Sequence, residues 1–74
     1  MFKAGDLIKI NNNNIVYYNT GMSGTYMLPK NSLFMFLEHI GNKKDIFEIK
    51  ILLENQVYFA YYCSEYKQCF EKLI

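Results

Sequence analysis

Alternation of apolar and polar side chains is the main pattern along this chain, and it predicts β-strands. The pattern is clearest over residues 46–54, where every second residue is apolar. Successive side chains of a strand point to opposite faces, so a period of two indicates a half-buried strand. The residues expected to face inward are Phe47, Ile49, Ile51 and Leu53. Apolar residues rarely recur with the helical period, so we expect an all-β fold.

Five further segments rich in β-branched and aromatic residues are predicted to be extended: 6–10, 15–18, 25–28, 32–40 and 56–62. Segments 15–18 and 25–28 form the arms of a loose hairpin, and polar segments 11–14, 19–24 and 41–45 are the expected turns. Segment 32–40 is apolar on both faces, which indicates a bent strand shared between two sheets. A helical turn over 33–37 is the alternative.

The end of the chain is less regular. Residues 63–66 look like a short helical turn, and 67–73 is read as a last strand, with a short amphipathic helix as the alternative.

The connection between segments 46–54 and 56–62 sets which residues face inward. A two-residue loop would pair Lys50 with Phe59 and mix core with solvent faces. A three-residue loop over 54–56 pairs Ile51 with Phe59 and makes one face wholly apolar, which is the arrangement that fixes register. We therefore expect the three-residue loop, with Val57, Phe59 and Tyr61 inward. The expected core comprises Phe36, Leu37, Ile49, Ile51, Val57 and Phe59.

The composition is that of one small folded domain, residues 1–74. Half of the 74 residues are hydrophobic (51%) and 18% are aromatic, which is enough for a core and argues against disorder. The apolar runs are too short to cross a membrane. The N-terminus lacks the apolar segment of a secretion signal. We expect a complete cytoplasmic chain without a membrane partner.

Charge and codon usage change the picture in two ways. Eight lysines and no arginine stand against seven acids, a net charge of +1, which disfavours nucleic acid as a partner. Phe, Tyr, Met, Ile, Asn and Lys, all encoded by A/T-rich codons, make up 41 of the 74 residues. Such usage is typical of an A/T-rich bacterium, a bacteriophage or another virus. It suggests an accessory protein of a phage or mobile element that acts in the host cytoplasm.

Candidate chemistry is sparse. Cys63 and Cys69 are expected to be reduced thiols, with a disulfide as the alternative. Together with the single histidine, His39, they fall short of a tetrahedral metal site and lack the usual spacing. Residues 21–24 lack the lysine and helix of a phosphate-binding loop. We therefore expect no catalytic residues, no metal and no cofactor, and the chain is predicted not to be an enzyme.

Two local stretches carry a resemblance to a known family. Residues 2–8, Phe-Lys-Ala-Gly-Asp-Leu-Ile, are similar to the opening of many prokaryotic and viral Src-homology-3-like barrels. Gly5 would allow a tight backbone there, and Asp6 would bond nearby turn amides. Residues 60–66 resemble the segment that closes the eukaryotic domain. Ser64 and Tyr66 match that segment, and Cys63 replaces its proline.

The resemblance implies a small five-stranded Src-homology-3-like barrel with a long loop hairpin and a short helical turn before the last strand. The eukaryotic domain grips proline-rich peptides with an aromatic groove that includes a tryptophan. This chain has no tryptophan, so that specificity is not implied.

The seven tyrosines are the strongest candidates for function. Adjacent tyrosines on a strand place one ring on each side, and exposed tyrosine is enriched in binding sites. In the barrel that the resemblance implies, four tyrosines would border one shallow groove: Tyr17, Tyr18, Tyr62 and Tyr66. The expected function is a non-catalytic protein-binding module that docks on a host or viral protein. The alternatives are a nucleic-acid-binding barrel and a structural piece that pairs by its edge strands. A further alternative is that the tyrosines only cap the barrel edges.

Overall fold

The computed structural model describes residues 2–11, 15–21, 23–63 and 70–73, and these form one antiparallel sheet. Its seven strands are β1 (Leu7–Ile10), β2 (Val16–Tyr18), β3 (Tyr26–Met27), β4 (Leu33–Lys43), β5 (Ile46–Leu53), β6 (Gln56–Cys63) and β7 (Phe70–Lys72). The all-β prediction is confirmed. The prediction of five strands is wrong, because the expected loop hairpin forms ladders of its own and so contributes β2 and β3. The expected helical turn lies outside the described residues, apart from Cys63, which ends β6.

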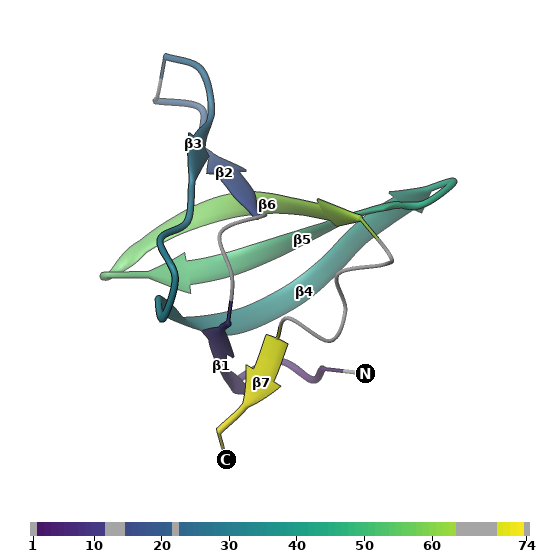
Figure 1. Ribbon diagram of the computed structural model, residues 1–74. Helices are drawn as coiled ribbons and strands as arrows, with labels where there is room; N and C mark the ends of the chain where they lie inside the picture. Colours follow the sequence, from purple (N-terminus) through teal and green to yellow (C-terminus); the bar gives the residue numbers. More distant parts are fainter. Residues whose placement is uncertain (1, 12–14, 22, 64–69, 74) are drawn as a thin grey trace.

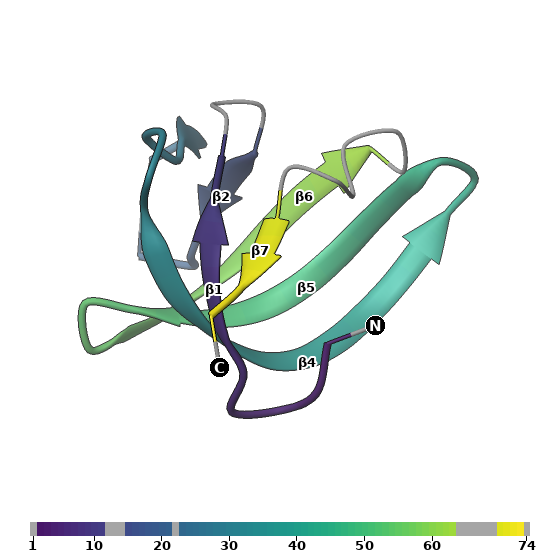
Figure 2. The ribbon, with the colours of Figure 1, turned by 60° about the horizontal axis from the view of Figure 1, so that its bottom comes forward.

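The sheet curls into a half-barrel in the order β3-β2-β6-β5-β4-β1-β7. Strands β4, β5 and β6 form a meander that curves round β1 and β7 (Figure 2). The β2–β3 hairpin projects beyond the meander (Figure 1). The inner, concave face of the sheet therefore holds the core, and the outer, convex face is left without a covering layer of described residues.

Strand β4 makes the curl possible because it is bent. Its first residues pair with β1, and from Met35 onward it pairs with β5. Register shifts at Leu37 and Ile40 mark two bulges, which bend a strand and increase its twist. The predicted bend is confirmed, but the expected sharing of the strand between two sheets is wrong, as is the alternative of a helical turn over 33–37. The structure joins both halves in a single continuous sheet.

The β5–β6 connection differs from the prediction. Leu53 pairs with Gln56, so the loop is only Glu54-Asn55, and both residues have positive φ (50° and 67°). Two consecutive positive φ values are the requirement of a type I′ turn, whose twist matches that of the flanking strands. The predicted three-residue loop is therefore wrong. The geometry of the turn sets this register, and the difference in hydrophobicity between the two faces of the hairpin does not.

The shorter loop reverses the faces of β6. The inner residues are Tyr58, Ala60 and Tyr62, while Val57 is 44% exposed. The prediction that Val57, Phe59 and Tyr61 face inward is wrong. It assumed that only one face of β6 is apolar, whereas both are.

The core fills the concave side of the sheet. Of the six expected core residues, Phe36, Ile49 and Ile51 are buried, as predicted. Leu37 is only half-buried because it occupies the first bulge, and Phe59 is half-buried on the outer face. The buried hydrophobic residues are Ile8, Ile10, Ile15, Leu28, Phe34, Phe36, Ile49, Ile51, Ala60 and Tyr62.

The last strand closes the half-barrel. Phe70 of β7 packs edge-on against Tyr62 of β6, with ring centroids 4.7 Å apart, although β7 and β6 lie far apart in the order of the sheet. Phe70 also contacts Phe2 and Phe34 (5.6 and 6.2 Å). The strand prediction for this segment is confirmed for Phe70–Lys72, and the helix alternative is wrong there.

The N-terminal turn fixes β1 and β7. Gly5 has φ of 94°, as expected for a residue that must adopt the left-handed region. The Asp6 Oδ2 atom accepts a hydrogen bond from the Lys3 backbone N–H at 2.8 Å, as expected. Asp6 Oδ1 also lies 3.7 Å from Lys72 Nζ, which ties the turn to β7.

We expect Ile51→Ala to lower the free energy of unfolding by about 2–5 kcal/mol, because Ile51 is fully buried and truncation leaves a cavity. Urea denaturation measures the change. Val57→Ala is the matched control on the exposed face, with an expected change within about 0.5 kcal/mol. Equal effects of the two substitutions would contradict the faces described above.

Replacing Glu54-Asn55 with Asn-Gly should stabilise the fold by about 1 kcal/mol. At position 54 asparagine adopts positive φ at lower cost than glutamate, and at position 55 glycine does so at lower cost than asparagine. The melting temperature measures the gain. Lys43→Gly is the control, since it creates an Asn-Gly pair at 42–43, which lies in β4 outside any turn. An unchanged or lower melting temperature of the 54–55 variant would show that the loop is not a type I′ turn.

Candidate functional site

The adjacent tyrosine pairs of β2 and β6 place one ring on each side of the sheet, as predicted. Tyr17 and Tyr62 face the core, whereas Tyr18 and Tyr61 face outward. The register explains which rings share a face. Tyr17 pairs with Ala60, which faces the core, and Tyr18 pairs with Phe59, which faces outward. The pairing therefore gathers aromatic rings on both faces of the same two strands.

The inner tyrosines are part of the core. Tyr62 is 3% exposed and stacks on Phe47, with ring centroids 5.4 Å apart. Burial raises the pKa of the Tyr62 phenol because the phenolate would lose its hydration. Tyr17 packs edge-on against Tyr58 at 5.1 Å and lies 6.2 Å from the exposed ring of Tyr26. These rings support the sheet from within and offer little area to a partner.

The outer tyrosines form a stacked pair held by hydrogen bonds. The rings of Tyr18 and Tyr61 are 5.3 Å apart and 13° from parallel, and Phe59 extends the cluster on the side of Tyr18 (5.5 Å). The Tyr61 hydroxyl donates to the Tyr18 hydroxyl oxygen at 3.1 Å, and the Tyr18 hydroxyl donates to Glu48 Oε2 at 2.6 Å. The orientation of each hydroxyl is thus fixed by the oxygen atom that accepts its hydrogen bond.

The electrostatics of this chain of hydrogen bonds favour the neutral phenol. The Tyr18 pKa is raised above its ordinary value of 10.0, first by the hydrogen bond to the Glu48 carboxylate and then by the bond from Tyr61. Ionising Tyr18 would remove the donor from the short bond and place two negative charges together. Tyr18 therefore stays protonated throughout the physiological range of pH.

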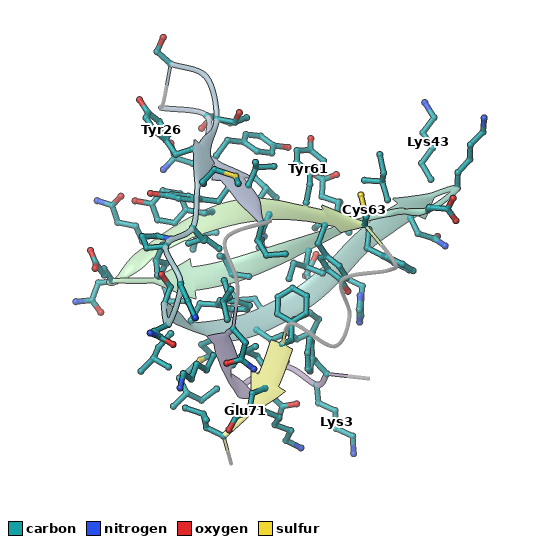
Figure 3. The ribbon with its side chains drawn as sticks, in the orientation of Figure 1. Lys3, Tyr26, Lys43, Tyr61, Cys63 and Glu71 are labelled. Carbon is teal, nitrogen blue, oxygen red and sulfur yellow. The ribbon has the colours of Figure 1, made fainter. Side chains whose placement is uncertain are left out.

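An open depression lies beside this pair on the outer face, with a volume of about 440 Å³. Its lining residues come from the β4–β5 hairpin and from β6: Ile40, Gly41, Asn42, Lys43, Ile46, Glu48 and Tyr61. Ile40 and Ile46 are large apolar side chains that are 43% and 49% exposed. Figure 3 shows Tyr61 on the side of the sheet away from Glu71 of β7, with Lys43 near the hairpin tip. We call Tyr18, Tyr61, Glu48 and this depression the outer aromatic site.

The four tyrosines predicted from the sequence do not share one surface. Tyr18 belongs to the outer aromatic site, whereas Tyr17 and Tyr62 lie on the opposite face of the sheet. Tyr66 lies outside the described residues. The sequence analysis missed Tyr61 and Glu48, because it placed β6 in the opposite register. The alternation of Glu48 with inward apolar residues marked it as outward, but nothing in the sequence linked it to Tyr18.

The described residues offer little for metal binding or catalysis. They contain no group of three or more His, Cys, Asp or Glu side chains that could hold a metal ion. His39 packs against Phe36, with ring centroids 4.8 Å apart. Cys63 is a half-buried free thiol, and Cys69 lies outside the described residues. Within the described ranges the structure also has no helix capable of crossing a membrane.

Comparisons of the chain with protein-family models, with curated proteins and with solved structures find no match.

Above pH 10 we expect the protein to lose stability, in part through Tyr18 and Tyr62. A folded-state pKa raised above the unfolded value means that the unfolded chain releases these protons first. The contribution is therefore complete below about pH 10 and is lost as the pH rises further. Urea denaturation at about pH 9 and about pH 11, on either side of the ordinary tyrosine pKa, measures the loss. Tyr18→Phe and Tyr62→Phe should each reduce it, whereas Tyr26→Phe, the control, should not. An identical loss in all four proteins would contradict the assignment.

Proposed function

We propose that this chain is a non-catalytic protein-binding module that captures a segment of a partner protein at the outer aromatic site. The observation that carries the proposal is the stacked Tyr18–Tyr61 pair, which lies beside an open, largely apolar depression. The pair is fixed by the hydrogen bond from Tyr61 to Tyr18 and by the one from Tyr18 to Glu48. Aromatic rings already held in place lose little conformational entropy on binding. Tyrosine also combines apolar area with a hydrogen-bonding hydroxyl, which is why it is enriched at protein interfaces.

The chemistry of the depression favours a mixed peptide segment as its occupant. Ile40 and Ile46 offer apolar area for an aliphatic or aromatic side chain of the partner. Lys43 and Glu48 stand at the same depression and provide one charge of each sign. A pocket with apolar walls and a few polar groups suits a short segment of protein, because the walls supply affinity and the polar groups supply orientation.

We also propose that the half-barrel is a Src-homology-3-like barrel. The pairing of β1 with β7, the β4–β5–β6 meander and the long β2–β3 hairpin between β1 and β4 support this relation. The A/T-rich codon usage supports an accessory protein of a phage or mobile element that acts in the host cytoplasm. The proposed site does not depend on either point, since it rests on the outer face alone.

The proposal predicts that peptides selected from a random library against the wild-type protein need Tyr61. Tyr61→Ala should weaken their binding at least about tenfold, or about 1.4 kcal/mol, as loss of a central aromatic anchor does. Fluorescence anisotropy with labelled selected peptides measures the affinity, and amide chemical shifts map the contact, which is expected over 40–48 and 59–61. Circular dichroism verifies that the variant is folded.

Tyr26→Ala is the matched control, because Tyr26 is 50% exposed on the projecting hairpin and outside the outer aromatic site. It should bind selected peptides as the wild type does. Full binding by folded Tyr61→Ala, or shifts confined to the β2–β3 hairpin, would overturn the proposed site.

A further inference from the structure

A second surface lies on the outer face, nearer to the β5–β6 turn than the outer aromatic site. Register aligns apolar side chains across four strands, since Leu7 pairs with Met35, Met35 with Leu52, and Leu52 with Val57. Each of the four points away from the core, and Met35 is 37% exposed. A continuous apolar row on a sheet face that no described element covers is unusual for an isolated domain.

The neighbouring row is charged and balanced. Glu38 of β4 pairs with Lys50 of β5 directly beside the Met35–Leu52 pair. Glu38 is exposed and Lys50 is half-buried. Among the described residues neither side chain has an ion-pair partner within 4.0 Å, and the one ion pair found there joins Lys72 to Asp6. Both charges are therefore available to an external partner.

We propose that this surface binds a second copy of the chain, face to face. The two-fold axis lies in the interface, parallel to the strands and above the line between β4 and β5. Such an axis places β4 of one copy over β5 of the other. Because the cross-strand pairs are in register, Met35 then lies over Leu52 of the second copy, and Glu38 lies over Lys50. Both the apolar row and the charged row are thus complementary to themselves, which a symmetric interface requires.

The curl of the sheet limits the size of this interface. The outer face is convex, so contact concentrates on the central strands β4 and β5 (Figure 2). Interfaces at the small end of the range are weak, and charge complementarity then decides which partner is accepted. We therefore expect a reversible dimer that forms as the protein is concentrated.

Sedimentation velocity of the full chain over a dilution series tests the proposal. The mass should rise from 8.8 kDa toward twice that value with concentration. Glu38→Lys sets like charges over one another, as does Lys50→Glu, so each variant should raise the dimer dissociation constant at least about tenfold. Met35→Glu should also abolish the dimer. Met27→Glu is the control, since Met27 is exposed on the projecting hairpin, and it should dimerise as the wild type does.

Mixing the two charge variants separates contacts between copies from effects within one chain. Glu38→Lys and Lys50→Glu should each remain monomeric alone but associate when combined, because every 38–50 contact then joins opposite charges. The double variant, Glu38→Lys with Lys50→Glu, should dimerise like the wild type. A monomer at all concentrations, or no association in the mixture, would overturn the proposal. Neither result bears on peptide binding, which uses other residues.

Discussion

The contact between Phe70 and Tyr62 joins two strands that are four places apart along the sheet. Without it the antiparallel sheet would be open on its concave side, and a chain of this length has few other residues to cover that side. Phe70 also touches Phe2 and Phe34, so a single ring brings β7, β4 and the N-terminal segment onto β6. The core exists as an enclosed volume because these aromatic rings meet across it.

The same closure explains why the outer face carries so many aromatic residues. The concave side is filled by residues such as Ile49, Ile51 and Tyr62. The alternate residues of the same strands, including Phe59 and Tyr61, must then lie on the convex side. Their packing against Tyr18 buries part of their area. The hydrogen bond from Tyr61 to Tyr18, and the one from Tyr18 to Glu48, hold the two tyrosine rings in place. A surface of this kind is rigid because it is built on the strands that also form the core.

The alternation over Ile46–Leu53 was enough to predict both the strand and its inner face, because Glu48 and Lys50 occupy the middle positions of its other face. The same reasoning failed for Gln56–Cys63, where apolar residues stand on both faces and either register buries an apolar set. Positive φ at Glu54 and Asn55 decided the register, and glutamate is a poor signal for that conformation. The wrong register of β6 also made the predicted site wrong, because it placed Tyr61 on the inner face. Tyr18 could be predicted as a surface ring, but its partner Tyr61 could be assigned to the outer face only once the turn was known.

The two proposed surfaces occupy different rows of one face, and their positions have a consequence for binding. The peptide site lies toward the β4–β5 tip, where Ile46 and Lys43 pair, while the dimer row lies nearer to the β5–β6 turn. A two-fold axis parallel to the strands leaves both β4–β5 tips at the same end of the dimer. Because the copies meet by their outer faces, the two peptide sites would lie opposite each other across the axis at that end. Weak binding at each site would combine into tighter binding of a partner that presents two copies of the recognised segment, because the second contact forms within the complex. A small convex sheet can in this way bind strongly even though each depression is shallow.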